Sequence, residues 1–203
     1  MDKKVVLDDI SNFVYNKLIN EGSGHDWWHI DRVRKNALLI GKRENANLLT
    51  IELAALLHDL IDEKLASDIR VSTVDIRALI KRYEVPDSVV DHVLSIIQQI
   101  SFRTNTPQML LTLEGKIVQD ADRLDAIGAI GIARTFAFSG SRGHLIYDPE
   151  NQKGKDAIRH FYDKLLKLKN LMNTKTGKEL AEERHKFMEL YLQQFYHEWG
   201  RTE

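Results

Sequence analysis

The sequence predicts an all-α protein, and three observations carry this prediction. Apolar residues recur at intervals of three and four along most of the 203 residues, which is the spacing of a helix face. No stretch shows the alternation and tight turn that are typical of a β-hairpin. No internal repeat or low-complexity tract interrupts the pattern. Because the length fits one large domain, we expect residues 1–203 to form a single domain.

The first three predicted helices lie in the N-terminal third of the chain. The first has an apolar stripe with helical spacing, formed by Val6, Ile10, Phe13, Val14 and Leu18. The second is expected over "SGHDWWHIDRVRKNALLIGKRE" (23–44), where small residues suited to a helix cap precede a stripe of Ile30, Val33, Ala37 and Ile40. The third, "TIELAALLHDLID" (50–62), is apolar on nearly all sides, which is typical of a helix at the centre of a bundle.

The rest of the chain is also predicted to be helical, around one long loop. Pro86 and Pro107 suit the first turns of two helices, expected over 89–100 and 109–122. The segment 138–154 is rich in Gly, Ser and Asn and is the longest predicted loop. Two charged amphipathic helices should follow, over 157–172 and 177–199, the second with a stripe of Leu180, Phe187, Tyr191, Phe195 and Trp199.

Composition narrows the chemistry and the partners. Lys and Arg number 29 against 30 Asp and Glu, a formal net charge of −1, so we expect no nucleic-acid polymer and no acidic membrane as a partner. The absence of Cys excludes disulfides and thiolate ligands, which leaves His, Asp and Glu for any metal. With no long apolar run either, a cytoplasmic protein is expected.

His58 and Asp59 stand together at the end of the most apolar predicted helix. An uncompensated carboxylate would be costly to bury there, so Asp59 requires a partner. The ordinary explanation is a hydrogen bond with His58 or an arginine from a neighbouring helix. Since adjacent helical residues point roughly 100° apart, both could instead reach one ion beside the helix.

The order of the polar residues points to the second explanation. "HDWWHIDRV" places His29 in the second predicted helix, and "QDADRLDAIGAIGIAR" places Asp122 at the end of another apolar stretch. The series His29, His58-Asp59, Asp122 resembles the H…HD…D signature of the HD-domain metal-dependent phosphohydrolases, an all-helical superfamily. "LLHDLIDEK" and "HFYDKLLKL" add a likeness to a small bacterial branch associated with nucleotide pyrophosphohydrolase activity.

The resemblance implies a ligand set and an organisation for this chain. His29, His58, Asp59 and Asp122 would hold one divalent ion, within a core spanning 20–135 on which helices over 155–200 pack. Mixed nitrogen and oxygen ligands suit a transition metal; Mn²⁺ is favoured, and Fe²⁺, Co²⁺, Ni²⁺ and Zn²⁺ also fit. Four ligands leave positions open for water and substrate, as in a catalytic site.

Further residues are candidates for acid–base chemistry and phosphate binding. Asp62, in the acidic extension "HDLIDE", is expected one helical turn beyond His58-Asp59, where it would receive or orient a proton of water. Substrate-binding candidates are His25, Lys64, Arg123 and Arg142. Each has an ordinary alternative: a helix cap for His25, a surface charge for Lys64, and an ion pair with Asp120 or Asp125 for Arg123. Trp27 and Trp28 are suited either to base stacking or to the core.

The expected activity is metal-dependent hydrolysis of (deoxy)nucleoside triphosphates to a monophosphate and pyrophosphate, with a nucleotide as the substrate partner. Within the same superfamily, a 5′-nucleotidase, an alarmone hydrolase or a cyclic-nucleotide hydrolase are alternatives. A helical regulatory module that holds a metal without turnover is an alternative from another class. The apolar helix faces are compatible with a homodimer and equally with burial in the core.

Overall fold

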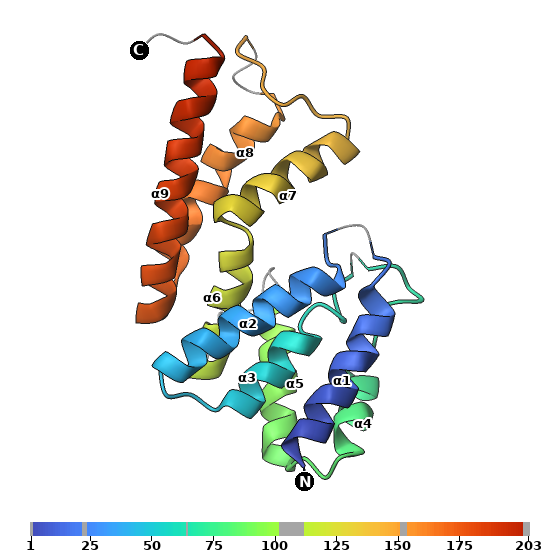
Figure 1. The fold of residues 1–203 in the computed structure, drawn as a ribbon. Coiled ribbons are helices and arrows are strands. Elements are labelled where there is room, and N and C mark those ends of the chain that lie inside the picture. The colour runs from blue at the N-terminus through green and yellow to red at the C-terminus, as the bar shows by residue number, and fades with distance from the viewer. Residues whose placement is uncertain (1, 22–23, 64, 102–111, 151–153, 201–203) are drawn as a thin grey trace. The chain divides into compact units, whose positions relative to one another are not determined.

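The all-α prediction is confirmed. The computed structural model describes residues 2–21, 24–63, 65–101, 112–150 and 154–200, which form nine α-helices, one 3₁₀ helix and no strand (Figure 1). They divide into two compact units, 1–121 and 122–203. Expectations for Lys64, Pro107 and the start of the helix predicted over 109–122 lie outside the described residues. The single-domain organisation stays a prediction.

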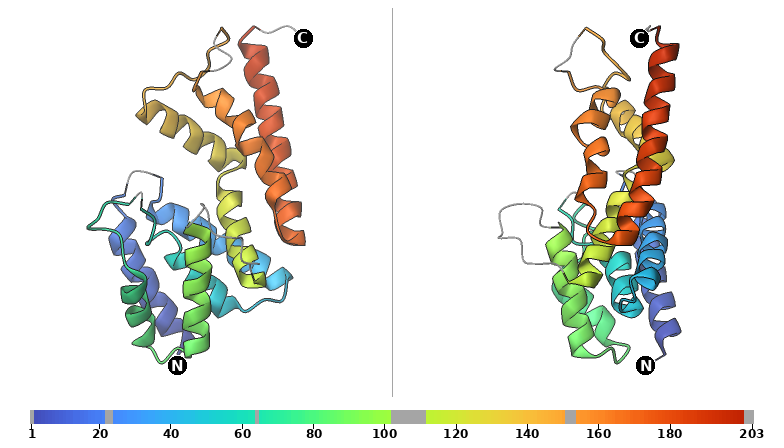
Figure 2. Two further views of the ribbon diagram at one scale, coloured as in Figure 1. Left: turned by 180° about the vertical axis from the view of Figure 1, so that it is seen from behind. Right: turned by 90° about the vertical axis from the view of Figure 1, so that its left-hand side faces the viewer.

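The first unit is built around a buried central helix. It contains α1 (Lys3–Leu18), α2 (Trp27–Arg43), α3 (Leu48–Leu57), α4 (Thr73–Lys81), α5 (Asp87–Ser101) and most of α6 (Leu113–Asp125). α3 packs against α1, α2 and α5, as Figures 1 and 2 show, and every residue from Leu49 to Leu57 is buried. The prediction of a central helix is therefore confirmed, because its surface is apolar nearly all round.

The helices of this unit largely follow their predicted stripes. Val6, Ile10, Val14 and Leu18 of α1 are buried, as are Ile30, Val33, Ala37 and Ile40 of α2. α5 begins directly after Pro86, whose carbonyl accepts from the N–H groups of Val89 and Val90. α4 has no counterpart among the predicted helices.

α3 is shorter than predicted. It ends at Leu57, with His58 as its C-cap. Residues 58–61 continue as turns, in which Leu60 N–H donates to the Leu57 carbonyl at 3.2 Å and Asp62 N–H to the Asp59 carbonyl at 3.0 Å. The prediction that His58, Asp59 and Asp62 lie on a regular helix is wrong, since this stretch is held by bonds between residues three apart, which wind the chain more tightly.

The second unit contains the end of α6 and then α7 (Gly128–Ser141), α8 (Ala157–Asp163), the 3₁₀ helix η1 (Leu165–Leu171) and α9 (Lys175–Glu198). α9 packs against α7 and η1, and it runs beside η1 in Figure 2. The loop predicted over 138–154 is wrong at its start, because α7 extends to Ser141. The helix predicted over 157–172 is divided between α8 and η1.

The buried face of α9 differs from the predicted stripe. It is formed by Thr176, Gly177, Ala181, His185, Met188 and Leu192. Phe187 and Trp199 are about half exposed, at 48% and 47%. The rings of Tyr191, Phe195 and Trp199 instead belong to an aromatic cluster that also includes Phe136, Tyr147, Phe161 and Tyr196.

Candidate metal centre

The ends of two helices in the first unit bring the predicted His and Asp side chains together. Asp26 is the N-cap of α2, and its carboxylate accepts a hydrogen bond of 2.7 Å from the backbone N–H of His29. This bond satisfies one of the unpaired donors of the first helical turn and fixes the position of His29. The buried turn after α3 supplies His58 and Asp59.

The ring of His58 is fixed by the end of its own helix. Ala55 is among the last four residues of α3, whose carbonyls have no partner within the helix. Nδ1 of His58 lies 2.9 Å from the Ala55 carbonyl oxygen, which accepts hydrogen bonds and cannot donate them. Nδ1 therefore carries a hydrogen, and in the neutral ring the lone pair lies on Nε2.

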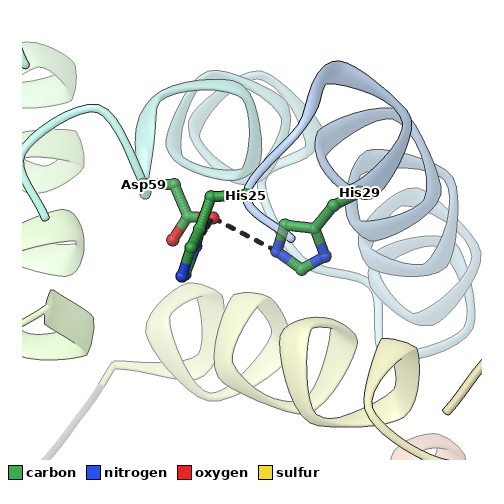
Figure 3. A group of neighbouring side chains, drawn as sticks. All are labelled: His25, His29 and Asp59. Atoms are coloured by element: carbon green, nitrogen blue, oxygen red, sulfur yellow. Dashed lines mark hydrogen bonds and ion pairs between the residues drawn. The ribbon is translucent and has the colours of Figure 1, made fainter. Parts of the chain in front are cut away.

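The Asp59 carboxylate lies among three imidazoles. Its Oδ2 is 2.7 Å from Nδ1 of His25 and 3.2 Å from Nε2 of His29, and its Oδ1 is 3.3 Å from Nε2 of His58. Figure 3 shows His25 and His29 beside this carboxylate. The rings of His29 and His58 meet edge to face, with centroids 5.5 Å apart. Asp59 and His29 are buried, whereas the His25 side chain is 20% exposed.

The electrostatics of the cluster keep Asp59 ionised. Burial by itself would raise the pKa of the Asp59 carboxyl, but the adjacent His58 and the hydrogen bonds from His25 and His29 outweigh it and hold that pKa well below its ordinary value. The hydrogen bond to Asp59 likewise raises the pKa of His25 against the effect of burial. A buried carboxylate is thus compensated here by three imidazoles.

The donors present fit a divalent metal ion. Ring nitrogens of His25 and His29 and a carboxylate oxygen of Asp59 lie within 4.8 Å of one another, a spacing that could surround an ion. The lone pair on Nε2 of His58 faces the Oδ1 of an ionised carboxylate at 3.3 Å, so the two electron-rich atoms need a proton or a cation between them. A ring whose other nitrogen donates to a backbone carbonyl is also the usual arrangement of a metal-binding His.

Two acidic residues predicted for the site can be placed. Asp62 is partly buried in the turn after Asp59, and its charge contributes to the raised pKa of His25, so it adjoins this cluster. Asp122 is partly buried on α6 and is the first residue of the second unit, directly after Ala121 of the first. The ligand and acid–base roles of these residues stay predictions.

The other candidates have contacts of their own. Arg123 donates to the Leu171 carbonyl, while Asp125 is paired with Arg134 at 2.6 Å. Arg142 is exposed, with its guanidinium carbon 5.4 Å from the centre of the Phe138 ring. Trp27 packs edge-on against Tyr15, with centroids 5.5 Å apart, and Trp28 is 56% exposed. Phosphate binding by Arg123 and Arg142 stays a prediction.

The structure also contains a partly buried ion pair between α2 and α3 that the sequence does not predict. Glu52, within the apolar α3, accepts from Arg34 of α2, whose Nε lies 2.7 Å from Oε1. The one signal in the sequence is a lone carboxylate inside "TIELAALL". Its partner could not be chosen from the sequence, because 29 Lys and Arg residues were available.

Comparison with known proteins identifies the class. The HD domain family matches residues 27–127, which include His29, His58, Asp59 and Asp122. The uncharacterized protein YpgQ of Bacillus subtilis (strain 168) is 47% identical over 189 residues, which make up 92% of this chain and 90% of YpgQ.

Among the described residues, no helix combines the length and apolar character needed to cross a membrane.

Solved structures agree with this result. The crystal structure of B. subtilis YpgQ in complex with ADP has a TM-score of 0.86 at 44% identity, covering 98% of this chain and 97% of that one. An HD-superfamily hydrolase from Bacillus thuringiensis has a TM-score of 0.84 at 42% identity, covering 98% of this chain and 100% of that one. The chain therefore belongs to the HD-domain hydrolase superfamily, whose domains bind divalent metals.

Proposed function

We propose that the protein is a metal-dependent phosphohydrolase that cleaves (deoxy)nucleoside triphosphates to a monophosphate and pyrophosphate. The observation that carries the proposal is the buried, ionised Asp59, whose two oxygens face ring nitrogens of His25, His29 and His58. His29, His58 and Asp59 would hold the ion, with Asp122 as the fourth ligand; Mn²⁺ is favoured because nitrogen and oxygen donors are mixed. When bound, the ion would polarise a phosphoryl oxygen and lower the pKa of a water molecule.

The residues of the chain would perform the remaining steps. Asp62 would accept the proton of the attacking water, because its charge adjoins His25 and its backbone is tied to that of Asp59 by a hydrogen bond of 3.0 Å. Asp122 follows the buried Ile117, Val118 and Ala121 on one continuous helix, so its backbone is held by α6. The binding of ADP by YpgQ supports a nucleotide as the substrate class.

A nucleotide panel tests the activity. Metal-free protein is supplied with one divalent metal at a time and incubated with nucleoside triphosphates, monophosphates, cyclic nucleotides and alarmones, and the products are resolved by chromatography. The proposal expects pyrophosphate and a monophosphate from triphosphates. Orthophosphate without pyrophosphate would favour a 5′-nucleotidase, and turnover of none of the substrates would favour the regulatory module.

The role of Asp62 has a matched control in the same loop. Asp62→Asn should lower kcat by about 10²–10⁴-fold, the usual contribution of a general base, while Mn²⁺ binding is kept. Asp68→Asn makes the same chemical change at an exposed side chain six positions further on and should leave kcat unchanged. Equal turnover by Asp62→Asn and wild-type protein would remove Asp62 from the mechanism.

A further inference from the structure

His25 contacts the metal centre from outside the helix that carries His29. It lies before Asp26, the N-cap of α2, so it is not part of the helix that carries His29. Its backbone N–H donates to Oε2 of Glu21 at 3.3 Å, which fixes the chain just ahead of the helix. Its side chain reaches back to Asp59, as Figure 3 shows.

The direction of the His25 hydrogen bond follows from the partner. An ionised carboxylate can only accept, so Nδ1 of His25 must donate to Oδ2 of Asp59 across 2.7 Å. This distance is that of a charge-assisted hydrogen bond, which is short and stronger than a neutral one. Because the donated hydrogen occupies Nδ1, that atom has no lone pair to offer to an ion.

The hydrogen bond from His25 restrains the carboxyl torsion of Asp59. Asp59 places Oδ2 3.2 Å from Nε2 of His29 and Oδ1 3.3 Å from Nε2 of His58, so its two oxygens face different rings. The carboxyl torsion of Asp has a broad, shallow energy profile, so the side chain does not choose this orientation by itself. Of the three imidazoles, His25 makes the shortest contact with the carboxylate.

We propose that His25 is a positioning residue of the metal centre: its Nδ1–H holds the Asp59 carboxylate in the orientation that binds a divalent metal ion, and His25 itself is not a ligand. The inference rests on the proposed metal site and adds a residue beyond the four predicted ligands. Loss of such a supporting hydrogen bond typically weakens metal affinity 10–100-fold.

Three substitutions separate positioning from ligation. His25→Asn places an amide N–H one bond from Cγ, as Nδ1 is in His, and so retains the donor to Asp59 without an aromatic nitrogen lone pair. His25→Gln places its amide one bond further out, and His25→Ala removes the donor. His92→Ala is the control, because it removes a half-buried imidazole of the same unit that contacts Thr112 and Glu114.

The measurement is the Kd of metal-free protein for Mn²⁺ by titration calorimetry, with circular dichroism to establish that each variant is folded. We expect His25→Ala and His25→Gln to weaken binding 10–100-fold, and His25→Asn and His92→Ala to stay within about threefold of wild type. If His25→Ala is unfolded, the test is the comparison of the Kd values of His25→Asn and His25→Gln for Mn²⁺.

Two results would overturn the inference. Unchanged affinity in His25→Ala or His25→Gln would show that the hydrogen bond does not support the site, and equal weakening by Asn and Ala would make His25 a ligand. Either result leaves the proposed hydrolysis intact. Failure of the wild-type protein to bind Mn²⁺ would overturn both, whereas normal binding with the expected series but no nucleotide turnover would overturn the proposed function alone.

Discussion

At the scale of single residues, the two ring nitrogens of His58 make different contacts. The Ala55 carbonyl takes the hydrogen of His58 Nδ1, and this leaves the Nε2 lone pair facing Asp59. A residue needed to cap the end of a helix is thereby also prepared to bind a cation. The sequence shows His58 beside Asp59, but the protonated nitrogen is decided by a carbonyl three residues earlier, which becomes available only because α3 ends at Leu57.

His160 of α8 makes the free energy of unfolding depend on pH. Partial burial lowers its pKa from the ordinary 6.5, nearby Lys164 lowers it further, and Asp163 opposes them. The unfolded chain therefore binds a proton at higher pH than the folded chain does. The contribution of His160 to stability is present above pH 6.5. It is lost as the pH falls from 6.5 through the lower pKa that His160 has in the folded chain.

Urea unfolding at several pH values tests this contribution. Between pH 7.5 and 5.5, His160→Asn should lose less unfolding free energy than the wild-type protein does, because Asn does not titrate. His197→Asn changes an exposed His of the same unit and should keep the wild-type pH dependence. The same slope in all three proteins would exclude His160 as the source.

At the scale of elements, α2 and α3 are joined by an antiparallel series of contacts. The chain reverses between Gly41, where an added Cβ would come within 2.7 Å of the Ile51 side chain, and the N-cap Asn47. Further along the two helices from this reversal is the Arg34–Glu52 pair, and the contact of His29 with Asp59 is furthest from it. The apolar periodicity predicted both helices; their register depends on one small residue and one ion pair, which periodicity does not reveal.

α7 shows why a helix was missed. Its sequence "GAIGIARTFAFSGS" carries three glycines, which disfavour a helix when judged locally. One of them, Gly131, is required by packing, since a Cβ there would lie 2.3 Å from the carbonyl oxygen of Ala126. The close approach of α7 to the link that precedes it has overridden helix propensity at this position, and no spacing rule contains that information.

Two glycines of α7 should respond to alanine in opposite ways. Gly131→Ala should destabilise the protein by about 1–3 kcal/mol, because the backbone has to shift to relieve the contact with Ala126. Gly140→Ala meets nothing within 4 Å and should stabilise it by up to about 0.5–1 kcal/mol, because alanine restricts the unfolded chain. Thermal unfolding measures both, and a loss of stability in Gly140→Ala comparable with that in Gly131→Ala would contradict the packing argument.

At the scale of the whole molecule, the sequence was sufficient for the class and for which residues to examine. His29, His58 and Asp59 are recognisable because two His and an Asp recur in a known order among apolar helices, and the structure brings these three side chains together. The sequence suggests His25 as a substrate-binding residue, which stays a prediction, but it does not reveal the contact with Asp59, because that contact depends on the chain turning just before α2. Spacing within a helix could not supply that turn.

Metal binding should stabilise the folded chain as a whole. Ligands from α2 and from the turn after α3 assemble only in the folded state, so an ion at a hundred times its Kd should add about 2.7 kcal/mol to the unfolding free energy. For a chain of this size that corresponds to a rise in Tm of roughly 5–10 °C on adding Mn²⁺ to chelator-treated protein. Ca²⁺ should raise the Tm far less, because it prefers oxygen ligands and this centre offers imidazole nitrogens.

Asp59→Ala should abolish the Mn²⁺ shift, since the anionic ligand is lost. Calorimetric scans of the two proteins, with each metal and without, give the comparison, and an equal Mn²⁺ shift in both would place the bound ion elsewhere in the molecule.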